Sequence, residues 1–261
     1  MSISVARRQT IADLLRRSAR RVPGRTALVC GDVSWSYAAL DAIVDRVARG
    51  LRGIGVGAGD KVAILARNSH AFIAMRFAIA RAGAVLVPVN FMLNADELAY
   101  ILGHSGARVL CTDSGLAELA RAAATKGTAI EQFIWLPGET PAEPCEGMIP
   151  FEALLEPGAD APRAEPDLHG GMLAQILYTS GTESLPKGAM LTHESVIAQY
   201  VSVMTAAGYS ATDTMLHAMP LFHCAQLDTF FGPCIYNGAT NVITASPAPE
   251  SILPKIGRYG I

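Results

Sequence analysis

Residues 179–188 combine side chains that suit a bound polyanion. Its hydroxyl residues include Thr179, Ser180 and Thr182, its two glycines are Gly181 and Gly188, and its one lysine is Lys187. The hydroxyl groups and the mobile ammonium group donate hydrogen bonds to phosphate oxygens. The glycines lack the Cβ atoms that would keep backbone N–H groups away from those oxygens. The pattern therefore predicts a loop that binds the phosphates of a nucleotide.

The Walker A loop is the first alternative for such a segment, and its spacing does not fit. That loop needs Ser or Thr directly after its lysine and leads straight into a helix. Here Gly188 follows Lys187, and Gly181 lies six positions before the lysine. Apolar runs stand on both sides, at 176–178 and at 189–191, and a helix is expected only from about His193. We therefore predict a loop between two strands; a chance surface hairpin remains the structural alternative.

The segment resembles the phosphate loop of the adenylate-forming superfamily, which includes acyl-CoA synthetases, luciferases and the adenylation domains of peptide synthetases. That loop reads Thr-Ser-Gly-Thr-Thr-Gly-x-Pro-Lys-Gly, and residues 179–188 match it at eight of ten positions, counting the free one. Glu183 and Ser184 stand where the family has Thr and Gly. A carboxylate beside a triphosphate is unfavourable unless it points to solvent or helps to hold a metal ion.

The resemblance implies roles for individual residues of this loop. Nucleotide binding falls to the matching positions and to the divergent glutamate, which are Thr179, Ser180, Gly181, Thr182, Glu183, Lys187 and Gly188. It also implies that Thr179 contacts Mg²⁺ and that Lys187 neutralises charge as pyrophosphate leaves. A second segment, 83–90, is similar to a family motif at the end of an early strand, and we assign its Pro88 and Asn90 to architecture.

His223 is the second candidate catalytic residue. It follows Pro220-Leu221-Phe222 about thirty-five residues after Lys187, where the family carries a segment that faces the carboxylate substrate. A thiol dyad of His223 with Cys224 is the competing interpretation. Adjacent residues seldom present nucleophile and base to each other, so we interpret Cys224 as a packing residue. The remaining histidines that we considered show no ligand spacing and are predicted to be structural: His104, His193 and His217.

Composition limits the class of protein. Half of the 261 residues are hydrophobic, and the net charge of −2 favours neither nucleic acid nor an acidic membrane as the main partner. The five scattered cysteines indicate neither a disulfide framework nor a zinc site. No signal peptide or transmembrane segment is apparent, and we predict a cytoplasmic protein. Peripheral membrane contact and a homodimer remain compatible with the sequence.

The chain before the loop alternates between strand-like and helix-like segments. Apolar runs at 61–65, 84–89 and 108–112 are typical of buried parallel strands, and helical spacing occupies 37–53, 68–82 and 95–103. Further strands are expected at 26–30, 33–36, 214–218 and 241–244, and further helices at 194–207 and 249–257. The pattern predicts an α/β fold of mostly parallel sheets flanked by helices, as in part of the large N-terminal domain of an adenylate-forming enzyme.

A segment rich in Pro, Gly, Glu and Ala, 136–166, is the best candidate boundary between two sub-sheets. We therefore expect one α/β sub-domain over 1–166 and the start of a second over 167–261. The resemblance covers essentially the whole chain but about half of a full family member, so we expect the chain to be truncated. The rest of the N-terminal domain and the C-terminal domain are then absent.

The resemblance implies an acyl-CoA synthetase that uses ATP, Mg²⁺ and coenzyme A. The enzyme would convert a carboxylic acid to its acyl-adenylate and then to the CoA thioester. Apolar residues around His223 favour a medium- or long-chain fatty acid over an amino acid, and an aromatic acid is the alternative substrate. A non-catalytic nucleotide-binding fragment and a P-loop NTPase are the alternatives from other classes of protein.

Overall fold

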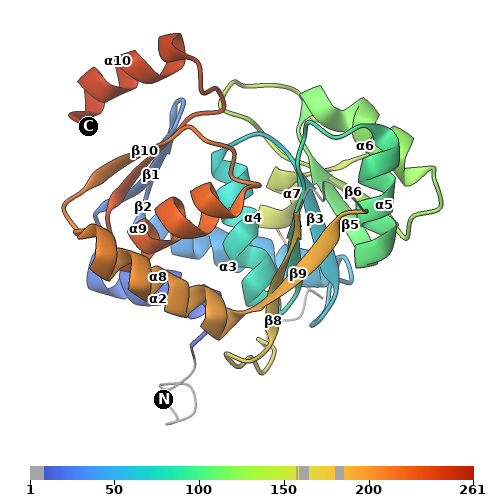
Figure 1. Cartoon of the computed structure of the whole chain (residues 1–261), viewed down its shortest axis with the longest axis horizontal. Coiled ribbons are helices and arrows are strands. Elements are labelled where there is room, and N and C mark those ends of the chain that lie inside the picture. The colour runs from blue at the N-terminus through green and yellow to red at the C-terminus, as the bar shows by residue number, and fades with distance from the viewer. Residues whose placement is uncertain (1–8, 157, 159–164, 180–184) are drawn as a thin grey trace.

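The computed structural model describes residues 9–156, 158, 165–179 and 185–261. Five residues of the predicted phosphate loop lie outside this range: Ser180, Gly181, Thr182, Glu183 and Ser184. The described strands form two sheets (Figure 1). Helices pack between the sheets and over the outer face of the larger one. The predicted fold class, mostly parallel sheets flanked by helices, is confirmed.

The larger sheet has seven described strands in the order β7-β6-β5-β3-β4-β8-β9. Every neighbouring pair is parallel except β8 with β9, which form an antiparallel hairpin. The strands are β3 (Lys61–Leu65), β4 (Val85–Pro88), β5 (Ala107–Thr112), β6 (Gln132–Trp135), β7 (Ile149–Pro150), β8 (Leu173–Thr179) and β9 (Lys187–Thr192). β8 joins the sheet through one parallel pairing, Leu86 with Gln175.

The smaller sheet has four described strands in the order β10-β11-β1-β2. They are β1 (Thr26–Cys30), β2 (Val33–Ser36), β10 (Thr214–His217) and β11 (Thr240–Ile243). β1 pairs with β2 in an antiparallel hairpin and with β11 in parallel. Strands from the beginning and from the end of the chain therefore lie side by side.

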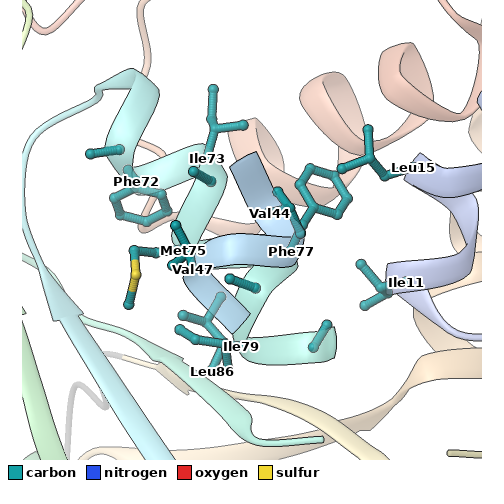
Figure 2. Packing of buried hydrophobic residues seen from close by; sticks show 14 of the residues in the cluster. Ile11, Leu15, Val44, Val47, Phe72, Ile73, Met75, Phe77, Ile79 and Leu86 are labelled. Carbon is teal, nitrogen blue, oxygen red and sulfur yellow. The ribbon is translucent and has the colours of Figure 1, made fainter. Parts of the chain in front are cut away.

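The main hydrophobic core fills the space between the two sheets. It is built on α2 (Ile11–Arg21), α3 (Tyr37–Gly53) and α4 (His70–Arg81), and every residue of α4 is buried. Figure 2 shows side chains of α2, α3 and α4 meeting there, with Leu86 of β4 against them. Ile11 and Leu15 lie on the buried face of α2, and Thr10 caps that helix with a reciprocal hydrogen-bond pair to Asp13.

A second core covers the opposite face of the larger sheet. It is formed by α5 (Ala95–Ser105) and α6 (Ala117–Ala124). Asn94 and Glu97 form a capping box at the start of α5, and Gly106 ends the helix in the left-handed conformation with φ 67°. These caps fix the position of α5, which contacts the β8–β9 hairpin.

The last third of the described chain contributes helices between and beside the sheets. After β9 come α8 (His193–Ala207), the π-helical segment η2 (Ala225–Phe231), α9 (Gly232–Asn237) and α10 (Pro249–Tyr259). The short helix α7 (Phe151–Leu155) lies earlier, next to β7. Among the described helices, none is long and apolar enough to cross a membrane.

The predicted boundary near residue 166 does not divide the sheets. β8 and β9 extend the sheet that β3 to β7 begin, and β10 and β11 extend the sheet that β1 and β2 begin. The segment 136–166 also includes β7 and α7, so it is partly structured. Both sheets draw strands from both sides of residue 166, and a boundary between sub-sheets at this point was wrong.

Candidate functional site

The predicted phosphate loop connects the two strands of the β8–β9 hairpin. Thr179 ends β8, Lys187 begins β9, and the register places these two residues opposite each other. Both are exposed. The hydroxyl and the ammonium groups therefore stand on either side of the loop, where both can reach one polyanion. The strand–loop–strand arrangement predicted from the sequence is confirmed.

Gly188 lies inside the hairpin, opposite Tyr178. A Cβ atom at this position would lie 2.8 Å from Ile176 Cγ2 and 3.2 Å from Tyr178 Cζ. Glycine is needed here because these side chains cross the strand closely. This packing requirement is independent of the phosphate contact predicted for Gly188, which stays a prediction.

Helix α5 braces both strands of the hairpin. His104 Nδ1 lies 2.7 Å from the hydroxyl oxygen of Tyr178 on β8, and the ring of Tyr100 stacks on that of His104. The Tyr100 hydroxyl donates to the carbonyl of Pro186, just before β9, at 3.3 Å. These contacts hold the two ends of the loop. His104 is structural, as predicted, but its effect on the loop was not foreseen.

Asn68, which lies between β3 and α4, holds the segment 217–223 through its side-chain amide. The buried Asn68 amide donates to the carbonyls of Met219 (2.8 Å) and Thr244 (3.1 Å). Its Oδ1 accepts from the N–H of Leu221 at 2.7 Å. Because both sides of the amide are used, Asn68 fixes the backbone that leads into His223. The sequence alone predicts Asn68 only as the start of a helix.

His223 presents one ring nitrogen to the solvent side of this segment. Its Nδ1 accepts a hydrogen bond from the N–H of Ala225 at 3.1 Å. The neutral ring therefore carries its proton on Nε2, which is left to donate to a ligand. Cys224 Sγ lies 3.9 Å from the same Nδ1, beyond the distance of a catalytic hydrogen bond. The thiol dyad gains no support from this geometry.

Thr179 and His223 line one pocket of about 470 Å³. Its wall is largely apolar and comes from the end of β4, from α5, from the hairpin and from Phe222. Phe91 packs edge-on against Phe222, with ring centroids 5.0 Å apart. The pocket thus brings together the start of the predicted phosphate loop and the segment that ends at His223. Lys187, at the start of β9, does not line it.

Three residues that we interpreted as architecture or packing also line this pocket: Pro88, Asn90 and Cys224. Cys224 is exposed, so its interpretation as a packing residue was wrong. The prediction failed because local sequence does not distinguish a residue at the edge of a pocket from a residue in an ordinary turn. Pro88 ends β4 and Asn90 follows it, and the carboxyl ends of parallel strands are where α/β folds place their sites.

The other predicted structural histidines are buried and hydrogen-bonded. His217 Nε2 lies 2.8 Å from Asn241 Oδ1, and its Nδ1 lies 2.6 Å from the amide nitrogen of Gln226. Burial lowers the pKa of His217 to about 4. His193 Nδ1 accepts from the N–H of Ile11, and burial, reinforced by the charge of Arg76, lowers the pKa of His193 to about 4. Both rings are neutral near pH 7.

A buried ionic network joins η2 to the hairpin. Asp228 of η2 pairs with Arg76 of α4 at 3.3 Å and accepts from the Tyr200 hydroxyl at 3.0 Å. Its second oxygen accepts from the amide of Gln175 on β8 at 2.6 Å. Gly232 follows η2, and a Cβ there would lie 2.1 Å from Tyr200. π-Helical turns are frequent at functional sites, and this one begins two residues after His223.

The described residues fit one part of a magnesium–nucleotide site. The exposed hydroxyl of Thr179 and the exposed ammonium of Lys187 suit phosphate oxygens. Among the described residues no group of three His, Cys, Asp or Glu side chains is placed to hold a metal ion. The predicted contact of Thr179 with Mg²⁺ therefore stays a prediction, and no step below depends on it.

The arrangement of the two sheets and the β8–β9 hairpin matches the N-terminal domain of adenylate-forming enzymes. The chain belongs to the family of AMP-binding enzymes, which matches residues 15–261. It is 35% identical over 243 residues to a feruloyl-CoA synthase of Amycolatopsis sp, covering 92% of this chain and 45% of that protein. It is 33% identical to the long-chain-fatty-acid–CoA ligase FadD13 of Mycobacterium tuberculosis, covering 85% and 42%. The chain spans about half the length of the curated relatives it matches.

Solved structures agree with this assignment. The apo structure of MbtA from Mycobacterium smegmatis superposes with a TM-score of 0.89 at 26% identity, covering 98% of this chain and 47% of that one. The N-terminal domain of FACL13 from Mycobacterium tuberculosis gives a TM-score of 0.83 at 28% identity, covering 97% and 61%. The predicted family and the predicted coverage of only the N-terminal part of its members are confirmed.

Proposed function

We propose that this chain supplies the phosphate-binding half of an AMP-forming acid–CoA ligase. One observation carries the proposal: Thr179, at the end of the phosphate hairpin, lines the same apolar pocket as His223. A site of this kind brings a polyanion and the polar end of an apolar acid into contact. Family membership supports the reaction class, because the relatives include several CoA ligases.

In the proposed first step, a carboxylate oxygen attacks the α-phosphorus of ATP. An acyl-adenylate forms as the bond to the β-phosphate breaks, and pyrophosphate leaves. Lys187 and the loop bind the β- and γ-phosphates and neutralise the departing charge. Mg²⁺ supplies further charge neutralisation when it is bound with ATP. His223 donates from Nε2 to the carboxylate and thereby orients it.

In the proposed second step, the thiol of coenzyme A attacks the acyl carbonyl. The C–S bond forms, the bond to the adenylate oxygen breaks, and AMP and the thiol proton leave. The apolar wall of the pocket keeps water away from the reactive adenylate, which would otherwise hydrolyse. The domains beyond residue 261 that relatives possess would complete the ATP site.

We propose that the substrate is a carboxylic acid with an apolar carbon skeleton, and a fatty acid is the first candidate. Aromatic acids are the second candidate, because relatives include a feruloyl-CoA synthase and an indoleacetate–CoA ligase. The described residues of the pocket wall are aliphatic or aromatic apart from a few polar groups near Thr179 and His223. An amino acid substrate lacks a visible carboxylate anchor for its ammonium group there.

Product analysis tests the reaction class. The purified chain is incubated with ATP, Mg²⁺, coenzyme A and a panel of fatty and aromatic acids, and nucleotides and thioesters are separated. The proposal expects AMP, pyrophosphate and a CoA thioester that depend on the acid. Formation of ADP and phosphate without an acid would identify an NTPase. Nucleotide binding without any product would identify a non-catalytic nucleotide-binding module.

A further inference from the structure

A second pocket, of about 520 Å³, lies at the carboxyl ends of strands β3, β5 and β6. It shares no lining residue with the pocket beside the hairpin. Arg67 follows β3, Asp113 to Gly115 follow β5, and Leu136 to Glu139 follow β6. Helix α10 contributes Ser251 and Lys255 to the lining. The function proposed above makes no use of this pocket.

The topology of the larger sheet explains why a hollow forms here. β3 and β5 are adjacent and parallel. After β3 the chain enters α4, which packs in the core between the sheets, whereas after β5 it enters α6, which packs on the opposite face. The two connections therefore diverge from neighbouring strands. In open α/β sheets this divergence leaves the crevice in which ligands bind.

The acidic groups of this pocket are already satisfied within the chain. Asp113 accepts from the backbone N–H of Arg67 at 2.9 Å and from its guanidinium at 3.1 Å. Glu139 accepts from the N–H of Ala245 at 2.8 Å and pairs with Lys255 at 2.9 Å. Backbone N–H, hydroxyl and ammonium donors to Glu139 lower its pKa, although burial opposes them. Both carboxylates are therefore anchors for the pocket wall.

Donor groups remain available. A guanidinium carries five N–H groups, and in the described chain only Nη1 of Arg67 is hydrogen-bonded, to Asp113. The Lys255 ammonium makes two of its three possible hydrogen bonds, to Glu139 and to the carbonyl of Ser251. Gly115 permits this arrangement, because a Cβ atom there would lie 2.6 Å from Arg67 Nη1. The hydroxyl groups of Thr140 and Ser251 complete the lining.

We infer that this pocket binds a small oxyanion, of the class of phosphate or a phosphate monoester. The carboxylates of Asp113 and Glu139 are occupied, whereas Arg67 and Lys255 keep free N–H groups, so the complementary ligand is rich in acceptors and negatively charged. Arg67 and Lys255 come from different elements, from the end of β3 and from α10. The site is separate from the phosphate hairpin and acts on a second ligand.

Calorimetric titration of the purified chain tests this site, with inorganic phosphate and glycerol 3-phosphate as probes at constant ionic strength. We expect saturable binding that weakens about tenfold or more in Arg67→Gln and in Lys255→Met, because each removes a charge-assisted contact. The matched control Lys126→Met leaves affinity unchanged, since Lys126 pairs with Asp96 on the surface.

A further variant keeps the test decisive if the loss of the Arg67–Asp113 contact unfolds the chain. Ala142 is exposed and lines the pocket, so Ala142→Trp fills the hollow without disturbing the core. It is expected to abolish binding of both probes while thermal unfolding stays unchanged. Tighter binding of glycerol 3-phosphate than of inorganic phosphate would assign the site to phosphate monoesters. Equal affinity for the two probes would assign it to the free anion. Absence of saturable binding up to about 10 mM, or undiminished binding in Ala142→Trp, would overturn the inference.

Discussion

Replacement of Asn68 by alanine tests how the segment before His223 is positioned. The change removes the hydrogen bonds to the carbonyls of Met219 and Thr244 and from the N–H of Leu221. Each such bond contributes about 1 kcal/mol net, so three of them correspond to a loss of about 3 kcal/mol in the free energy of unfolding. The loss approaches the upper end of the effect of single substitutions because the freed groups are buried and cannot regain water.

The assay is chemical denaturation of the wild type and two variants. Asn237→Ala is the matched control, because its half-buried amide makes one hydrogen bond, to the carbonyl of Tyr209. We expect a loss of about 1 kcal/mol in the control, a third of that in Asn68→Ala. The reactivity of the exposed Cys224 toward a thiol reagent gives a local readout, and it is expected to change only in Asn68→Ala. Equal stability of the two variants, with unchanged Cys224 reactivity, would refute the reasoning.

Three further predictions concern the core and the hairpin. Stability should fall as the pH drops from about 6.5 to about 4, because buried His193 and His217 stay neutral in the folded chain while unfolded histidines bind protons, and pH-dependent unfolding measures this. A flat profile would contradict their burial. Gly188→Val should cost about 1–3 kcal/mol in chemical denaturation through contact with Ile176, whereas Met190→Val, at an exposed position of the same strand, should cost less than about 0.5 kcal/mol. Asp228→Asn should cost about 3–5 kcal/mol because Arg76 would remain buried without its counter-charge; thermal unfolding checks this against the exposed Asp96→Asn, and equal values would rule it out.

The hairpin shows what local sequence can predict. Apolar runs on both sides of the loop indicate two strands, and the lysine and hydroxyl types indicate a polyanion. The pairing of Thr179 with Lys187 was not predictable, because the register of a hairpin depends on the length of the loop and on the type of turn. The brace from α5 was not predictable either. Tyr178 and His104 are 74 positions apart, and nothing in either local sequence points to the other.

The errors have a common cause in long-range pairing. A segment rich in proline and glycine such as 136–166 has the composition of a linker, yet the strands on either side of it belong to one sheet. Asn68 has the residue type and position of a helix start, while its amide is hydrogen-bonded to Met219 and Leu221, 151 and 153 residues further along the chain. The π-helical turn likewise has the sequence of an ordinary helix, and the buried charge of Asp228 is its one unusual feature.

Acid-dependent exchange of labelled pyrophosphate into ATP is the most direct test of the proposed function. The exchange needs only the first half-reaction and reports reversal of acyl-adenylate formation. The wild-type chain is predicted to catalyse it with a fatty or aromatic acid, Lys187→Ala to lose it while remaining folded, and Lys126→Ala to retain it. Exchange that persists in Lys187→Ala, or a folded wild-type chain that catalyses none with any acid of the panel, would contradict the account.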